Sequence, residues 1–95
     1  MMCGGFGEAK AADKNVKALA NEMKLKVEKA LGLTFSDFDA IKYKTQVVAG
    51  TNYKIKVQVG NRKYVHIKVF VPLPGKKAKN QLLEQEGGKT LEDPL

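Results

Sequence analysis

The side chains best suited to covalent or acid–base chemistry are few in this chain and stand far apart. Cys3 is the sole cysteine and His66 the sole histidine. A cysteine nucleophile needs a base within hydrogen-bond reach on a rigid frame, and Cys3 stands in a glycine-rich stretch that offers none. Asp37 and Asp39 have no second acidic cluster to accompany them, and one cysteine with one histidine makes no zinc-ligand pattern. We therefore predict that the chain is not an enzyme and holds no metal or cofactor.

A short run of small and apolar residues points to binding instead. It consists of Gln46, Val47, Val48, Ala49 and Gly50. The residues on both sides alternate as in β-strands, and one strand through the whole stretch would far exceed the usual length of about 5–6 residues. We expect the chain to turn near residues 49–52, because Gly50 and Asn52 tolerate positive φ. The result is an apolar hairpin tip (residues 46–50) that faces water and that a partner would cover.

The first element expected to support this tip is an amphipathic helix over residues 14–31. Asp13 is the expected N-cap, and Gly32 the expected residue after the last turn. Leu25 lies off the apolar stripe and is expected to be partly exposed. The stripe itself follows steps of three and four, as on one face of an α-helix, and contains Val16, Leu19, Ala20, Met23, Val27, Ala30 and Leu31.

Three alternating segments predict antiparallel strands at residues 40–48, 52–59 and 63–71, with a short turn at residues 60–62. Their apolar face can cover the helix stripe, which predicts an α+β fold: an antiparallel meander of four to five strands wrapped around one α-helix. The expected core-facing residues are Ile41, Tyr43, Thr45, Val47, Tyr53, Ile55, Val57, Val59, Val65, Ile67, Val69 and Val71. The opposite, wet face is expected to carry, among others, Ala40, Lys42, Lys44, Lys54, Lys56, Tyr64, His66, Lys68 and Phe70.

A second turn follows the third strand at residues 72–75, where two prolines end the ladder. Leu73 stands between these prolines and is expected to be exposed. Alternate turns of a meander lie at the same end of the sheet. We therefore expect Leu73 and Pro74 to be neighbours of the hairpin tip, with the turn at residues 60–62 at the opposite end.

The two ends of the chain carry weaker patterns, and we expect a single domain over residues 1–95. Residues 1–10 are rich in glycine and predict a flexible N-terminal arm. Residues 76–95 carry the weakest periodic pattern of the chain. Residues 80–84 suggest a short edge strand there, while Gly87, Gly88 and Pro94 speak against regular structure beyond it.

The formal net charge of +7 comes almost entirely from lysine, since Arg62 is the single arginine among 17 basic residues. Lysine keeps a surface soluble, whereas arginine is the usual choice for bidentate recognition of phosphate and guanine. A small basic β-sheet module that binds nucleic acid non-specifically stays open as an alternative, supported by Tyr43, Tyr53 and Tyr64 near lysines. Neither a signal peptide nor a membrane-spanning run is visible, so we expect a cytoplasmic protein.

Read together, the motifs resemble those of the stefins, the type 1 cystatins without disulfides. The residues of the hairpin tip match the glutamine–valine–x–alanine–glycine motif of the cystatin superfamily. Residues 43–45, 51–53 and 63–70 also look like stefin segments, and Leu73, Pro74 and Gly75 match the second binding turn. The start of the chain matches the stefin N-terminus, with its glycine at position 4. The resemblance covers roughly residues 1–75.

This resemblance implies a reversible, tight-binding, competitive inhibitor of papain-like cysteine proteases such as papain and the cathepsins. It implies a three-part wedge for the protease cleft, made of Gly4, Gly5, Gln46, Val47, Val48, Ala49, Gly50, Leu73 and Pro74. The expected state is a monomer, with a domain-swapped or Cys3-linked dimer as a further possibility. One departure stands out: residues 71–95 contain no aromatic residue, where stefins usually carry two, so a short or frayed fifth strand is expected.

Overall fold

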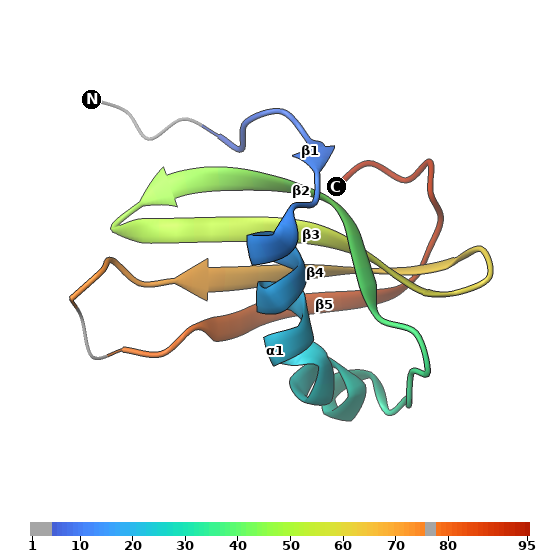
Figure 1. Ribbon diagram of the computed structural model, residues 1–95. Coiled ribbons are helices and arrows are strands. Elements are labelled where there is room, and N and C mark those ends of the chain that lie inside the picture. Colours follow the sequence, from blue (N-terminus) through green and yellow to red (C-terminus); the bar gives the residue numbers. More distant parts are fainter. Residues whose placement is uncertain (1–4, 76–77) are drawn as a thin grey trace.

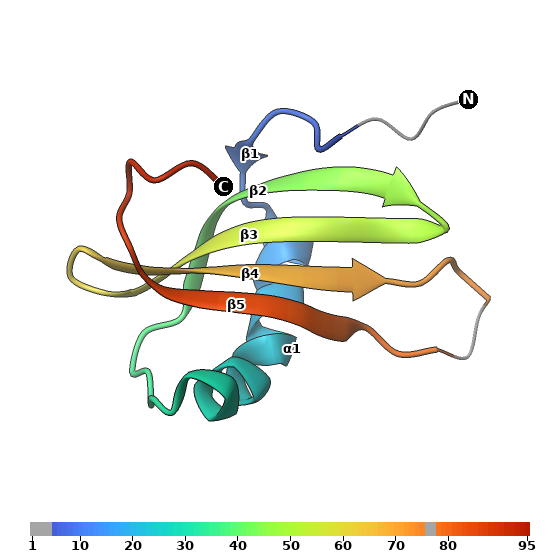
Figure 2. The same cartoon turned by 180° about the vertical axis from the view of Figure 1, so that it is seen from behind.

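The computed structural model describes residues 5–75 and 78–95 and contains one α-helix and one five-stranded antiparallel sheet (Figure 1). The sheet curves around the helix, which crosses one of its faces; Figure 2 shows the opposite face. Strands that follow each other in the chain are neighbours in the sheet. This confirms the predicted α+β meander around one helix. The elements are β1 (Lys10–Ala11), α1 (Lys14–Leu31), β2 (Asp39–Val48), β3 (Gly50–Gly60), β4 (Lys63–Val71) and β5 (Gln81–Lys89).

Helix α1 begins and ends at the predicted residues. The carboxylate of Asp13 accepts a hydrogen bond from the Val16 amide at 2.9 Å, as an N-cap should. Gly32 takes a left-handed φ of 69° and its N–H bonds to the Glu28 carbonyl, which closes the C-terminus. The predicted burial of Ala30 is wrong: it is exposed, because the last turn of α1 runs past the β5 edge of the sheet (Figure 1).

The core lies between α1 and the concave face of strands β3 and β4, as predicted. In β2 the alternation differs: Ala40, expected on the wet face, is buried, while Ile41 is only half-buried. A register shift between Ala40 and Lys42 causes this, since one extra residue reverses which side chains face the core. The buried core cluster comprises Val16, Leu19, Ala20, Met23, Val27, Phe35, Ala40, Ile55, Val57, Val65, Ile67 and Val69.

Strand β5 is longer than the sequence suggested. It extends from Gln81 to Lys89 and continues through Gly87 and Gly88, so the expectation of a short strand ending before the glycines is wrong. A register shift opposite Tyr64 and His66 and a positive φ of 68° at Gly88 accommodate this pair without breaking the ladder. Leu82 packs against the core. The missing aromatic residues therefore do not prevent a fifth strand.

The residues after β5 cross back over the convex face of the sheet and bury part of it (Figure 2). Lys56 and Tyr64 were expected to face water, but only 1% and 9% of their surfaces are exposed. The Lys56 ammonium donates to the carbonyls of Thr90, Leu91 and Asp93 at 2.7, 2.8 and 2.6 Å. Burial lowers the pKa of Lys56, and the three carbonyls replace the water that the ammonium loses.

The N-terminal segment contains a short strand that the sequence did not reveal. Lys10 and Ala11 pair with Tyr43 and Lys42 at the edge of β2. Further along, the Gly7 amide donates to the Thr45 carbonyl at 2.9 Å. Part of the predicted arm of residues 1–10 therefore lies along β2, and it runs toward the end of the sheet that carries the hairpin tip.

Candidate functional site

The hairpin tip and the second turn lie side by side at one end of the molecule. Thr51, just after the tip, is in register with Val71, the last residue of β4, so the chain enters residues 72–75 beside the tip. The turn at residues 61–62 lies at the opposite end (Figure 1). The predicted neighbourhood of the two turns is thus confirmed. The hairpin is tighter than expected, because Val48 pairs with Gly50 and leaves Ala49 alone at the bend.

Gly50 is the point where the hairpin packs against the end of β4, just before the second turn. Its φ of 127° is one that side chains of L-residues rarely adopt. A Cβ at this position would lie 2.6 Å from the Val71 carbonyl oxygen and 2.8 Å from two ring carbons of Phe70. The absence of a side chain therefore lets the hairpin pack directly against the end of β4, which fixes the tip relative to the second turn.

Both turns present apolar side chains to solvent. Val47 is 71% exposed and Leu73 is 47% exposed. Ala49 and Pro74 are also exposed, while Val48 is half-buried. Val47 shares the core-facing side of β2, but it lies beyond the end of the core, so nothing in the fold covers it. Two exposed apolar turns on one rigid edge form a ready-made contact surface for a partner.

A side-chain bridge stiffens the base of the hairpin. Gln46 and Asn52 are directly opposite each other on β2 and β3. The Asn52 amide nitrogen donates to the Gln46 side-chain oxygen at 3.1 Å. The bridge ties the two strands together just before the bend, so the tip is held by both main-chain and side-chain bonds.

Of the two N-terminal glycines in the predicted wedge, the structure describes only Gly5. Gly5 is described and exposed, with open space around the position of a Cβ. Gly4 and Cys3 lie outside the described residues. Because Lys10 pairs with Tyr43 and Gly7 bonds to Thr45, the chain between Lys10 and Gly7 follows β2 in the direction of Val47.

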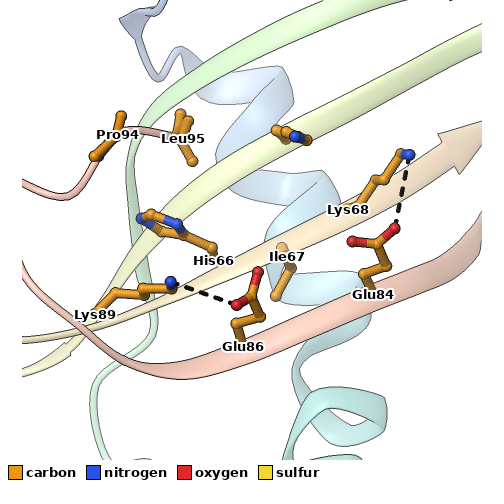
Figure 3. Close-up of a pocket in the computed structure, with 9 residues that line it drawn as sticks. His66, Ile67, Lys68, Glu84, Glu86, Lys89, Pro94 and Leu95 are labelled. Atoms are coloured by element: carbon orange, nitrogen blue, oxygen red, sulfur yellow. Dashed lines mark ion pairs between the residues drawn. The ribbon is translucent and has the colours of Figure 1, made fainter.

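His66 lies on the convex face, away from both turns. It stands in a cavity of about 240 Å³ roofed by Pro94 and Leu95, with Glu86 and Lys89 beside it (Figure 3). Burial, together with the charges of Lys56 and Lys89, lowers the pKa of His66 to about 4, and its buried Nε2 has no hydrogen-bond partner among the described residues. A neutral imidazole in register with Lys56 and Glu86 is a cross-strand packing residue, as the alternation of β4 suggested.

The described residues give little support to a metal site, a membrane span or a nucleic-acid interface. Within residues 5–75 and 78–95, no group of three or more histidine, cysteine or acidic side chains gathers as a metal site would require. Among the same residues, no helix is long and apolar enough to cross a membrane. Tyr43 and Tyr53 stack on each other at 6.1 Å between ring centroids and pack against the core. Their half-buried rings contact each other and the core, unlike the exposed rings on which nucleic-acid bases stack.

Comparison with known proteins assigns the chain to a family. A family model of the cystatin domain matches residues 4–92. Over all 95 residues, the chain is 46% identical to cystatin-A of Felis catus and 41% identical to cystatin-A of Homo sapiens, covering 97% of each. It is 42% identical to leukocyte cysteine proteinase inhibitor 1 of Sus scrofa, of which it covers 92%. The chain belongs to the cystatin family, among the type 1 cystatins.

The structure of this cystatin agrees with that assignment. It superposes on a secreted type 1 cystatin from Fasciola hepatica with a TM-score of 0.74 at 29% identity, over 90% of this chain and 96% of the other. The resemblance to stefins inferred from the motifs is confirmed. Cystatins are protease inhibitors rather than enzymes, which also confirms the expectation that this chain is not an enzyme.

Proposed function

We propose that this cystatin is a reversible, tight-binding, competitive inhibitor of papain-like cysteine proteases. Family membership supports inhibition of cysteine proteases, and a relative that is 42% identical carries the name cysteine proteinase inhibitor. The observation that carries the mode of binding is the pair of exposed apolar turns at one end of the sheet, centred on Val47 and Leu73. These turns and the N-terminal residues Gly4 and Gly5 would enter the protease cleft together as a wedge.

The proposed wedge suits a protease cleft for physical reasons. Its two turns are fixed by the β2–β3 and β3–β4 ladders and by the contact at Gly50, so little conformational entropy is lost on binding. Val48, Ala49 and Gly50 are small enough to enter a narrow groove. Protease–inhibitor contacts bury about 1,600 Å² in total, which three short segments can supply. The inhibitor offers no peptide bond in a cleavable geometry if the turns stay folded.

The test is a titration of papain and a panel of cathepsins with the purified protein, read with a fluorogenic peptide substrate. Tight, competitive inhibition is expected. No inhibition of any papain-like protease by the folded protein would refute the proposal. The titration is repeated at several substrate concentrations, because the apparent inhibition constant of a competitive inhibitor increases with the substrate concentration.

A matched pair of variants tests the wedge itself. Val47 and Leu25 are both 71% exposed, but Val47 is at the hairpin tip and Leu25 on the outer face of α1. Val47→Asp should raise the inhibition constant about 100-fold or more, because burying an unpaired carboxylate at a contact costs several kcal/mol. Leu25→Asp should leave the constant within about twofold, since a charge on a solvated face costs little. Equal effects of the two substitutions would remove the hairpin from the proposed contact.

Three further expectations stay predictions. The monomeric state, with a domain-swapped or Cys3-linked dimer as a further possibility, is one; Cys3 lies outside the described residues. A cytoplasmic location is the second. The third is that any binding of oligonucleotides is non-specific and disappears at modest salt, as the +7 charge alone would give. Size-exclusion chromatography with and without reductant, and a salt titration of oligonucleotide binding, measure the first and the last.

A further inference from the structure

The aromatic ring of Phe6 lies among three lysine side chains. The ammonium groups of Lys44, Lys54 and Lys68 lie 5.7, 4.8 and 5.8 Å from the centre of its ring. A cation within about 6 Å of an aromatic face is attracted by the ring quadrupole. The Phe6 ring is therefore a contact that all three lysine ammonium groups share.

The sheet register explains why the three lysines meet. Lys44 of β2 is directly opposite Lys54 of β3, and Lys54 is directly opposite Lys68 of β4. The three form one row across the convex face, next to the row of Gln46, Asn52 and Phe70 at the base of the hairpin. Like charges directly opposite each other repel. Three contacts offset this repulsion: the Phe6 ring, the Leu95 main-chain oxygen that accepts from the Lys44 ammonium, and Glu84 at 3.8 Å from Lys68.

The main chain around Phe6 has few other means of being held. Gly4, Gly5 and Gly7 carry no side chain, so Phe6 is the one residue of positions 4–7 whose side chain can contact the sheet. The Gly7 amide bonds to Thr45, next to Lys44 in β2. Glycine on both sides gives the chain wide conformational freedom. The ring and the Gly7 bond therefore hold residues 6 and 7 against the sheet.

We propose that Phe6 is a positioning residue for protease inhibition: seated on the lysine row of Lys44, Lys54 and Lys68, it fixes the point from which residues 1–5 reach the protease. This rests on the proposed function, because it assigns a role within the same wedge. Phe6 would act before binding, by holding the start of the arm beside the hairpin tip, so that less ordering is needed when the protease arrives.

The first experiment examines the free protein and does not depend on inhibition. Nitrogen-15 relaxation and amide hydrogen exchange are measured at Gly5 and Gly7 in the wild type, Phe6→Ala and Phe6→Trp. Phe6→Ala should increase fast motion at Gly5 and speed exchange of the Gly7 amide severalfold, while Phe6→Trp retains the wild-type values, since tryptophan is the best cation–π partner. Unchanged relaxation and exchange in Phe6→Ala would overturn the proposal.

Two lysine variants ask whether the ring is held by the cations. Lys54 is nearest to the Phe6 ring, and Lys42 lies on the same face two residues from Lys44. Lys54→Met and Lys42→Met remove the same charge from the same face. Lys54→Met should loosen Gly5 and Gly7 as Phe6→Ala does, and Lys42→Met should not. Equal loosening by both would show a general charge effect and contradict a seat on the lysine row.

The second experiment separates positioning from direct contact. Inhibition constants for papain are compared for Phe6→Ala in the full chain and in a chain lacking residues 1–5. In the full chain, Phe6→Ala should raise the constant about three- to tenfold, mainly through faster dissociation. In the shortened chain, the same substitution should change it by less than about twofold. An equal loss in both chains would make Phe6 a direct contact residue and refute the positioning role.

The outcomes distinguish this inference from the proposed function. If the wild type inhibits no papain-like protease, the proposed function fails, and the relaxation data alone decide whether the lysine row holds Phe6. If the wild type inhibits papain and Phe6→Ala alters neither relaxation nor the inhibition constant, the inference fails while the proposed function stands.

Discussion

At the scale of single residues, both the backbone conformation and the packing at Gly50 disfavour any side chain. Gly50→Ala should lower the free energy of unfolding by about 2–6 kcal/mol, since a strained φ costs about 1–3 kcal/mol and overpacking a similar amount. Gly88→Ala is the matched control, because Gly88 has a φ of 68° but nothing within 4 Å of an added Cβ. That variant should lose only about 1 kcal/mol. Urea unfolding followed by circular dichroism measures both, and equal losses would contradict a packing role for Gly50.

The sequence predicted only half of what Gly50 does. Its position between alternating segments indicated a turn with positive φ, which a local pattern can reveal. Its contact with Phe70 and the Val71 carbonyl joins residues about twenty positions apart, and such contacts depend on sheet register. Gln46 is similar: its place in the motif was visible, but its bridge to Asn52 required the pairing of β2 with β3.

At the scale of elements, the sequence predicted a helix or strand well wherever local signals, such as a cap residue or a periodic pattern, define it. Helix α1 has a cap residue, a period and a stop signal, and its bounds were correct. Strands β2, β3 and β4 alternate over nine to eleven residues, so they too were found. The two-residue strand β1 is too short for periodicity. Strand β5 contains two glycines, and the segment after it covers Lys56 through main-chain carbonyls, which carry no sequence signature.

The segment after β5 also gives the molecule a predictable dependence on pH. It covers His66, whose pKa falls from 6.5 to about 4 through burial and the charges of Lys56 and Lys89, opposed by Asp93 and Glu86. As pH falls, the unfolded chain binds a proton at about 6.5 while the folded chain does not, so protonation favours unfolding. Stability contributed by neutral His66 is therefore lost between about pH 6.5 and 4, with no further loss from this group below about 4.

His66→Gln removes this titration and provides the comparison. Unfolding free energies from urea denaturation at about pH 7, 5.5 and 4 should fall more steeply for the wild type than for the variant. Asp93, whose pKa is lowered by its hydrogen bonds to Thr90, loses its contribution at still lower pH in both proteins. Parallel pH profiles in the two proteins would mean that His66 is not protected from protonation by the fold.

At the scale of the whole molecule, the elongated shape separates the proposed binding end from the rest. The principal extents are 41, 28 and 22 Å, and the hairpin tip lies at one end of the sheet with the turn at residues 61–62 at the other (Figure 1). The meander order, which the sequence did predict, is what brings two turns from different hairpins to one end. The family follows from the whole chain, because the match spans residues 4–92 rather than one motif.

This separation predicts that inhibition and stability respond to different substitutions. Leu73 in the second turn is 47% exposed, and Leu33, in the loop after α1 beside the turn at residues 61–62, is 53% exposed. Leu73→Ala should raise the inhibition constant for papain about 5- to 30-fold, because about 1–2 kcal/mol of apolar burial at the contact is lost. Leu33→Ala removes the same atoms at the far end and should leave the constant unchanged. Since both side chains are about half exposed in the free protein, neither variant should lose more than about 1 kcal/mol of unfolding free energy. Weaker inhibition by Leu33→Ala, with the fold intact, would place part of the protease contact at the far end and refute a wedge confined to the hairpin end.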